Sequence, residues 1–125
     1  MFGDAERIVI EALGDLLATV STEPPTGPLS STPHVQVELD GTPEVVEAWG
    51  GKTVAELATV RLVAHCKPGD RTAVKALASQ ALSAALLIPG ASTLVGRSSV
   101  TPDPTTKNLM VWALLRLAVP AQRAS

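Results

Sequence analysis

Two histidines and one cysteine are the side chains best suited to chemistry, and all three lie in stretches with an alternating pattern. His34 begins the stretch HVQVEL, and His65 and Cys66 end a longer one. A thiol beside an imidazole can act as a nucleophile pair, but consecutive strand residues point to opposite faces, so His65 and Cys66 cannot readily meet. Neither histidine has a carboxylate or thiol at metal-ligand spacing. We therefore expect structural histidines, with neither a catalytic dyad nor a metal site.

The glycines, serines and carboxylates do not complete a catalytic motif either. Gly50-Gly51 and Gly90 lack the spacing of a dinucleotide-binding or phosphate-binding loop, and the serines lack the nucleophile-elbow pattern. Glu44, Glu47 and Glu56 could lie near one another, which would suit acid–base work, but no base or oxyanion donor accompanies them. An acidic, solvated surface that faces a partner is the better interpretation. We expect no enzyme activity and no cofactor.

Composition limits the class of protein. A chain of 125 residues with 46% apolar and 18% charged residues is typical of one globular domain, here residues 1–125. Three aromatic residues and a formal net charge of −2 argue against nucleic-acid binding, which uses stacking platforms and basic surfaces. One cysteine excludes a disulfide within the chain. Neither a secretory leader nor an apolar run of about 20 residues is present, so we expect no membrane association.

Charge is divided unevenly along the chain. Up to residue 60, ten acidic residues stand against Arg7 and Lys52, which gives a formal charge of −8. From Arg61 onward, eight basic residues stand against two acidic ones, which gives +6. The opposite charges of the two halves could partly cancel when the halves fold together. Alternatively, one acidic and one basic side would suit head-to-tail self-association.

The elements that must position these residues are clearest between residues 56 and 88. Residues 56–66 alternate in polarity and predict a strand. Lys67-Pro68-Gly69 breaks that pattern, and Asp70 is a good N-cap residue. Residues 70–88 then follow a period of about 3.6, which predicts an amphipathic helix ended by Pro89-Gly90. We expect the rest of the chain to pack on this strand and helix.

The chain before this unit predicts one more helix and one more strand. Residues 4–20 have a broad apolar helical face, and 21–33 hold four prolines and predict an exposed loop. Residues 34–39 alternate and predict a strand. Residues 42–53 fit neither period; we expect a flexible loop, with a short strand as the alternative. Trp49 in this segment is either a partner contact or a cover for the edge of the core.

The end of the chain predicts a hairpin of strands 93–101 and 109–119. The last strand is apolar on both faces, interrupted by Arg116. A sheet with one wet face would alternate, so we expect the helices to cover one face and a neighbouring subunit to cover the other. Arg61 and Arg116 fall in mid-strand, on faces that could lie side by side. They would line a channel or subunit seam, or they are ordinary surface arginines with their head groups in water.

Together these patterns predict a two-layer α+β fold with a mixed or mainly antiparallel sheet of about four or five strands, packed by two amphipathic helices. The candidate residues for a subunit or partner interface are charged side chains and the two tryptophans. They are Glu44, Glu47, Trp49, Lys52, Arg61, Arg97, Trp112 and Arg116.

Four stretches of the chain resemble the tail terminator proteins of long-tailed, lambda-type bacteriophages and prophages. They are EALGDLLATV, PHVQVELDG, CKPGDRTAVKALASQALSAAL and GRSSVTPDPTTKNLMVWALLRLAVP. The resemblance covers nearly the whole chain, and it lies in the order and pattern of the elements rather than in a diagnostic motif.

The resemblance implies a structural virion protein that is made in the host cytoplasm and placed at the head–tail junction. Six copies would form a ring that caps the tail tube, stops its polymerisation and docks to the head–tail connector protein. In that family the loop between the early strands rearranges when the ring forms, a role that would fall here to residues 42–53. This chain departs from the family pattern in having a short loop whose one aromatic anchor is Trp49.

Three other interpretations remain. Another head–tail neck or completion protein would share the size and copy number. A small oligomeric α/β ligand-binding domain or enzyme would need a convergent polar cluster in a deep pocket. A cellular adaptor would use the Trp49 loop to hold a peptide.

Overall fold

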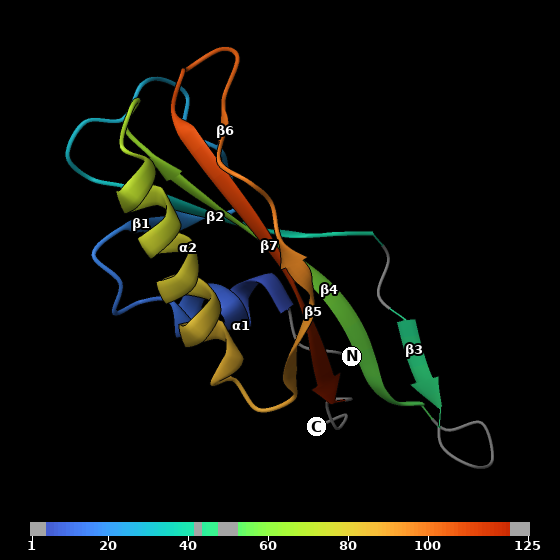
Figure 1. The fold of residues 1–125 in the computed structure, drawn as a ribbon. Coiled ribbons are helices and arrows are strands. Elements are labelled where there is room, and N and C mark those ends of the chain that lie inside the picture. The colour runs from blue at the N-terminus through green and yellow to red at the C-terminus, as the bar shows by residue number, and fades with distance from the viewer. Residues whose placement is uncertain (1–4, 42–43, 48–52, 121–125) are drawn as a thin grey trace.

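The computed structural model describes residues 5–41, 44–47 and 53–120, which form two helices and one seven-stranded sheet (Figure 1). The elements in chain order are α1 (Ala5–Ala12), β1 (Thr19–Ser21), β2 (His34–Leu39), β3 (Glu44–Glu47), β4 (Thr53–Cys66), α2 (Arg71–Leu86), β5 (Ala91–Arg97), β6 (Thr101–Pro102) and β7 (Leu109–Pro120). The expected α+β class with a mixed sheet is confirmed, and the sheet has more strands than the four or five expected.

The sheet is organised around β4 and β7, which pair antiparallel from Ala55–Pro120 to Cys66–Leu109. The main strand order is β1-β2-β4-β7-β5, with β3 paired to one end of β4 and β6 to one end of β7. The β1–β2 pair is parallel, and the other strand pairs are antiparallel. The last strand of the chain therefore lies in the middle of the sheet.

Both helices lie on the same side of the sheet (Figure 1). Helix α2 packs on β4 and β7, and α1 packs on β2 and β4. One alternating row of β7 faces the helices and is buried, from Leu109 to Val119. The matching row of β4, from Ala58 to Cys66, completes this face. These aliphatic rows and the apolar stripes of the helices form the core.

Helix α2 begins and ends close to where the sequence predicts. The Asp70 carboxylate accepts a hydrogen bond from the Ala73 backbone N–H at 3.1 Å, which caps the first turn. Gly69 before it has a φ of 86°, a conformation that glycine adopts without strain. The helix buries Val74 and Leu77 against the sheet and ends at Leu86.

The expected helix over residues 4–20 is wrong beyond Ala12, where α1 ends. Tight turns follow, with hydrogen bonds from Gly14 N to Glu11 O and from Leu16 N to Leu13 O. Thr19–Ser21 then forms β1 beside the first half of β2. A glycine weakens a helix interior, and β-branched residues favour a strand. As a result Leu17, expected on the apolar face, is 94% exposed.

The expected flexible loop over 42–53 is wrong for residues 44–47, which form β3 on an extension of β4. The strand expected over 56–66 begins earlier, at Thr53. Residues 42–43 and 48–52 lie outside the described residues. At the other end of the chain, the strand expected over 93–101 consists of β5 and β6, which both pair with β7.

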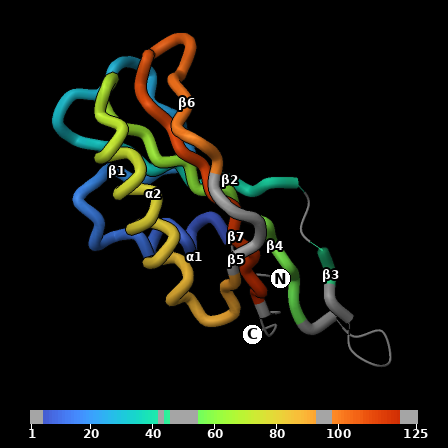
Figure 2. The backbone as a smooth tube through the Cα atoms, in the orientation of Figure 1, coloured from blue at the N-terminus to red at the C-terminus, as the bar shows by residue number. Residues whose placement is uncertain are grey.

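The Pro-rich connector, residues 22–33, joins the parallel strands β1 and β2 and is tied to the start of β7. The Asn108 side chain is fully buried and binds the connector twice. Its Oδ1 accepts the Leu29 N–H at 2.8 Å, and its Nδ2 donates to the Gly27 carbonyl at 3.0 Å. Figure 2 shows the connector and the β6–β7 turn at the same end of the sheet. The connector is therefore ordered by side-chain contacts and has no helix of its own.

Candidate subunit interface

The face of the sheet opposite the helices carries no helix within the described part of the chain (Figure 1). We call it the open face, and its central residues are Glu38 on β2, Arg61 on β4, and Trp112, Leu114 and Arg116 on β7. The register places Arg61 opposite both Glu38 and Leu114, and Arg116 opposite Thr59. Residues two apart on a strand share a face, so Arg61 and Arg116 lie on the same face, as the sequence suggested.

The two arginines of the open face differ in their charge balance. Arg61 Nε donates to Glu38 Oε1 at 2.6 Å, and its Nη2 contacts the same oxygen. Gln36 Nε2 donates to the other carboxylate oxygen at 3.3 Å. Arg116 is exposed and forms no ion pair among the described residues. Within the described ranges, the open face therefore holds one ion pair beside one arginine without an ion-pair partner.

The apolar part of the open face is only partly covered. Trp112 is 40% exposed, whereas Met110, Leu114 and Ala118 are half-buried. The helix-facing row of the same strand is buried throughout. The expectation of cover on both faces is thus met on the helix side alone within the described residues. An exposed indole among half-buried aliphatic side chains, beside arginine, is a composition that protein interfaces favour.

His34 and His65 lie together at one end of the open face, with ring centroids 5.9 Å apart. His34 Nε2 donates to the Glu23 carbonyl at 2.8 Å, and its Nδ1 lies 2.6 Å from Thr19 Oγ1. His65 Nε2 donates to Gln36 Oε1 at 3.2 Å, while its buried Nδ1 has no hydrogen-bond partner. The pair fastens β1, β2 and the Pro-rich connector together. This arrangement fits the structural role expected for both histidines.

Burial shifts the pKa of His65 and of the neighbouring Cys66 thiol. Burial, reinforced by the charge of His34, lowers the pKa of His65 from 6.5 to about 4, against a smaller opposing effect of Asp103. Cys66 points to the opposite face and packs in the core, where burial raises the pKa of its thiol. The thiol and the imidazole are thus kept apart and in their neutral forms at neutral pH, as their adjacent positions on one strand predict.

The remaining candidate residues lie toward the two edges of the sheet. Glu44 is exposed at the start of β3, beside Val45, which is 55% exposed. Glu47 ends the same strand. Arg97 ends β5, on the far edge of the sheet, in register with Ala113 of β7. The structure therefore brings together Arg61, Trp112 and Arg116, and it separates Glu44 and Glu47 from Arg97. Trp49 and Lys52 lie outside the described residues.

Sequence reasoning missed Glu38, which neutralises Arg61, and Asn108, which holds the connector. The HVQVEL pattern places His34, Gln36 and Glu38 on one face. Their partners depend on how β2 aligns with β4, and a sequence without that register could not identify them. No local signal marks Asn108, because its partners lie 79 and 81 residues earlier in the chain.

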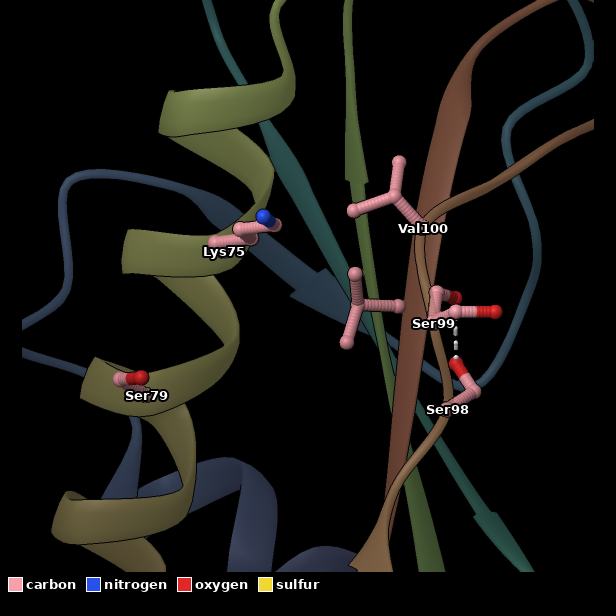
Figure 3. A pocket seen from close by; sticks show the side chains of 6 residues that line it. Lys75, Ser79, Ser98, Ser99 and Val100 are labelled. Carbon is pink, nitrogen blue, oxygen red and sulfur yellow. Dashed lines mark hydrogen bonds between the residues drawn. The ribbon is translucent and has the colours of Figure 1, made fainter.

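A surface pocket of about 380 Å³ lies on the helix side, between α2 and the segment that follows β5 (Figure 3). Lys75 and Ser79 of α2 face Ser98, Ser99 and Val100 across it, over Val111. Ser98 Oγ donates to the Ser99 carbonyl at 3.0 Å and accepts the Trp112 N–H at 3.0 Å. Among the described residues, the lining contains one cation and three hydroxyl groups, without a carboxylate, imidazole or thiol.

The described residues hold neither a metal-ligand cluster nor a membrane-spanning helix. No cluster of three or more histidine, cysteine, aspartate or glutamate side chains there could hold a metal ion. No helix in the described ranges is both long and apolar enough to cross a bilayer.

No protein-family model and no curated protein matches this chain in sequence.

Proposed function

We propose that this protein is a structural virion protein, the tail terminator of a long-tailed phage or prophage. It forms a ring, hexameric in the family that it resembles, which caps the finished tail tube and ends its polymerisation. The ring then joins the tail to the head–tail connector protein at the junction with the filled head. The protein is made in the host cytoplasm and acts by assembly rather than by catalysis.

The open face is the observation that carries this proposal. It combines a 40%-exposed indole with an arginine that has no ion-pair partner among the described residues, on a sheet whose other face is packed by helices over β2, β4 and β7. Exposed tryptophan and arginine are the residue types that most often contribute strongly to protein–protein binding. A single chain that leaves them open is suited to contact other protein chains.

The distribution of charge also supports assembly into a closed ring. Glutamates lie on β3 at one edge of the sheet, and Arg97 lies on β5 at the opposite edge. A surface that is complementary to a different surface of the same molecule forms a head-to-tail contact, which closes into a ring when the rotation fits. Opposite charges on the two surfaces steer copies into this orientation.

Other neck or completion proteins are the nearest alternative, because they would use the same kind of surface in the same place. The mixed sheet with two helices on one side agrees with the architecture implied by the terminator family and supports that choice. A small ligand-binding domain or enzyme has weaker support: the pocket beside α2 has a lining of serines, valines and one lysine. The paired histidines lie on the open face, away from this pocket.

A tube-growth assay tests the proposed function directly. Purified chain is added, at increasing molar ratio, to the polymerising tail tube protein of the same virus or prophage, and tube lengths are measured by electron microscopy. We expect tubes to stop growing and to carry a ring of added density at one end. An unrelated protein of similar mass serves as the control. Tubes of unchanged length and bare ends at every ratio would refute the proposal.

Light scattering across a wide concentration range, at low and high salt, measures the self-association. We expect a discrete oligomer that weakens as salt is raised, because screened charges attract less at ionic strengths above about 0.1 M.

A further inference from the structure

The end of the sheet that contains β3 and β5 has two open edges. There the strands follow the order β3-β4-β7-β5, and within the described residues β3 pairs with β4 alone and β5 with β7 alone. The outer side of each edge strand therefore presents backbone N–H and C=O groups without a strand partner. Such edges are templates for pairing with another chain unless they are blocked. On β3 the edge also carries Val45, which is 55% exposed.

We infer that copies of this chain join edge to edge, with β5 of one copy pairing with β3 of the next to continue the sheet. This inference rests on the ring proposed above and names the contact that builds it. It leaves both faces of the sheet uncovered by the contact, so the open face remains available to the tail tube or the connector protein.

Strand direction allows this contact without turning either copy over. The pairs β3–β4, β4–β7 and β7–β5 are all antiparallel, so β3 and β5 run in opposite directions. A β3 strand placed beside β5 of a neighbour in the same orientation is therefore antiparallel to it. The continued sheet stays antiparallel across the junction, and each copy uses a different edge on each side. That is the head-to-tail arrangement from which rings are built.

Charge favours this pairing over its two competitors. Strand β3 contains Glu44 and Glu47 and no basic residue, whereas β5 contains Arg97 and no acidic residue. Two β3 strands side by side would bring four glutamates together, and two β5 strands would bring two arginines together. Like charges across paired strands are destabilising, and opposite charges are stabilising.

The two edges differ in length and regularity. β3 has four residues and β5 has seven, with register shifts between Val46 and Glu47 and between Thr93 and Arg97. The two strands therefore cannot pair end to end, and the contact extends over part of β5. A register that sets Glu44 beside Arg97 brings opposite charges together, and it is the register that the inferred contact uses.

Cysteine cross-linking tests the pairing. Three variants are compared with the native chain under mild oxidation: Glu44→Cys, Arg97→Cys and the double variant with both. Residues opposite each other on antiparallel strands have Cα atoms about 4.5–5.5 Å apart, which a disulfide can bridge. Cys66 is 3% exposed in the core, so the native chain is the control for background oxidation.

We expect the double variant to form a ladder of covalent oligomers that ends at the ring, while each single variant stays uncross-linked. A covalent dimer from Glu44→Cys alone or from Arg97→Cys alone would mean that like edges pair, and would overturn the inference. Oligomers in light scattering without any cross-link would also overturn it, and would leave the ring itself standing. A strict monomer at every concentration would overturn it as well, and the tube-growth assay would then decide the proposed function by itself.

Charge reversal gives a second, independent measurement. Glu44→Arg and Arg97→Glu should each lower the oligomer fraction at low salt, and the double reversal should restore it, which a misfolded chain would not do. Asp15→Arg is the matched control, because Asp15 is exposed on the helix side, away from both edges. Equal oligomer fractions for the two single reversals and the native chain would count against the contact.

Discussion

Replacing Asn108 with alanine should loosen the Pro-rich connector with little effect on the rest of the sheet. The Asn108 side chain is fully buried, and it makes two hydrogen bonds to the connector, 2.8 Å from the Leu29 N–H and 3.0 Å to the Gly27 carbonyl. The β6–β7 turn does not need the side chain, because it is closed by backbone bonds between Asp103 and Asn108 and between Lys107 and Asp103. The substitution therefore removes only the two hydrogen bonds between the Asn108 side chain and the connector.

The magnitude follows from these two bonds. Each bond contributes about 1 kcal/mol, and a partner left buried without a bond costs about 1–3 kcal/mol. Leu29 and Gly27 are half-buried, so water can replace part of the loss at both. We expect the free energy of unfolding to fall by about 2–3 kcal/mol. For a chain of this length, an unfolding entropy of about 2.1 cal/mol/K per residue converts this into a melting temperature lower by about 10 °C.

Urea unfolding and amide hydrogen exchange measure the two parts of the prediction. The Leu29 amide should exchange far faster in Asn108→Ala. The exchange rates of amides in β4 and β7 should change only as much as the change in the global free energy of unfolding requires. Thr105→Ala is the control, because Thr105 is an exposed residue of the same turn. A loss below about 0.5 kcal/mol, with Leu29 still protected, would refute the role given to Asn108.

Two further predictions concern pH and backbone strain. The pKa of His65 is lowered to about 4 in the folded chain, so the unfolded chain binds the extra proton first as pH falls. The free energy of unfolding should be highest above pH 6.5 and should decrease by roughly 2–3 kcal/mol toward pH 4, as measured by urea unfolding at several pH values. In His65→Gln this decrease should be smaller. An equally steep decrease in the variant would contradict the assignment to His65. Gly90 and Gly41 both have a φ of 87°, but a Cβ at Gly90 would lie 2.8 Å from the Ala118 carbonyl oxygen, whereas Gly41 faces open space. Gly90→Ala should therefore lower the free energy of unfolding by clearly more than the loss of about 1–2 kcal/mol expected for Gly41→Ala, as measured by urea unfolding. Equal losses would show that the close approach is relieved by a small backbone shift.

The sequence predicted best those elements whose local pattern agrees with their surroundings. Strand β2 has the expected bounds of 34–39, and α2 begins after Asp70 because a capping carboxylate and a positive-φ glycine precede it. The opposite orientations of His65 and Cys66 followed from strand geometry alone. In each case a short-range rule was sufficient.

The elements that sequence reasoning missed depend on contacts between distant segments. Leu16 and Leu17 continue a helical pattern, yet Thr19–Ser21 forms a strand because it pairs with β2. Val45 lies in a strand because β4 extends beyond the body of the sheet to pair with it. The same holds for the candidate interface. Arg61 and Arg116 could be placed on one face from alternation, but the neutralisation of Arg61 by Glu38 depends on the register of β2.

The place of β7 in the sheet has a consequence for the order of events during synthesis. β7 follows β4 and β5 in the sequence, yet it lies between them in the finished sheet. Until residues 108–120 are made, β4 lacks its longest partner, β5 lacks the strand that it pairs with, and the Pro-rich connector lacks Asn108. The sheet is completed only when β7 inserts between β4 and β5, and such non-local closure is slow. The edge at β5 depends on this step, so a chain can offer both of its sheet edges to neighbours only after β7 has been made.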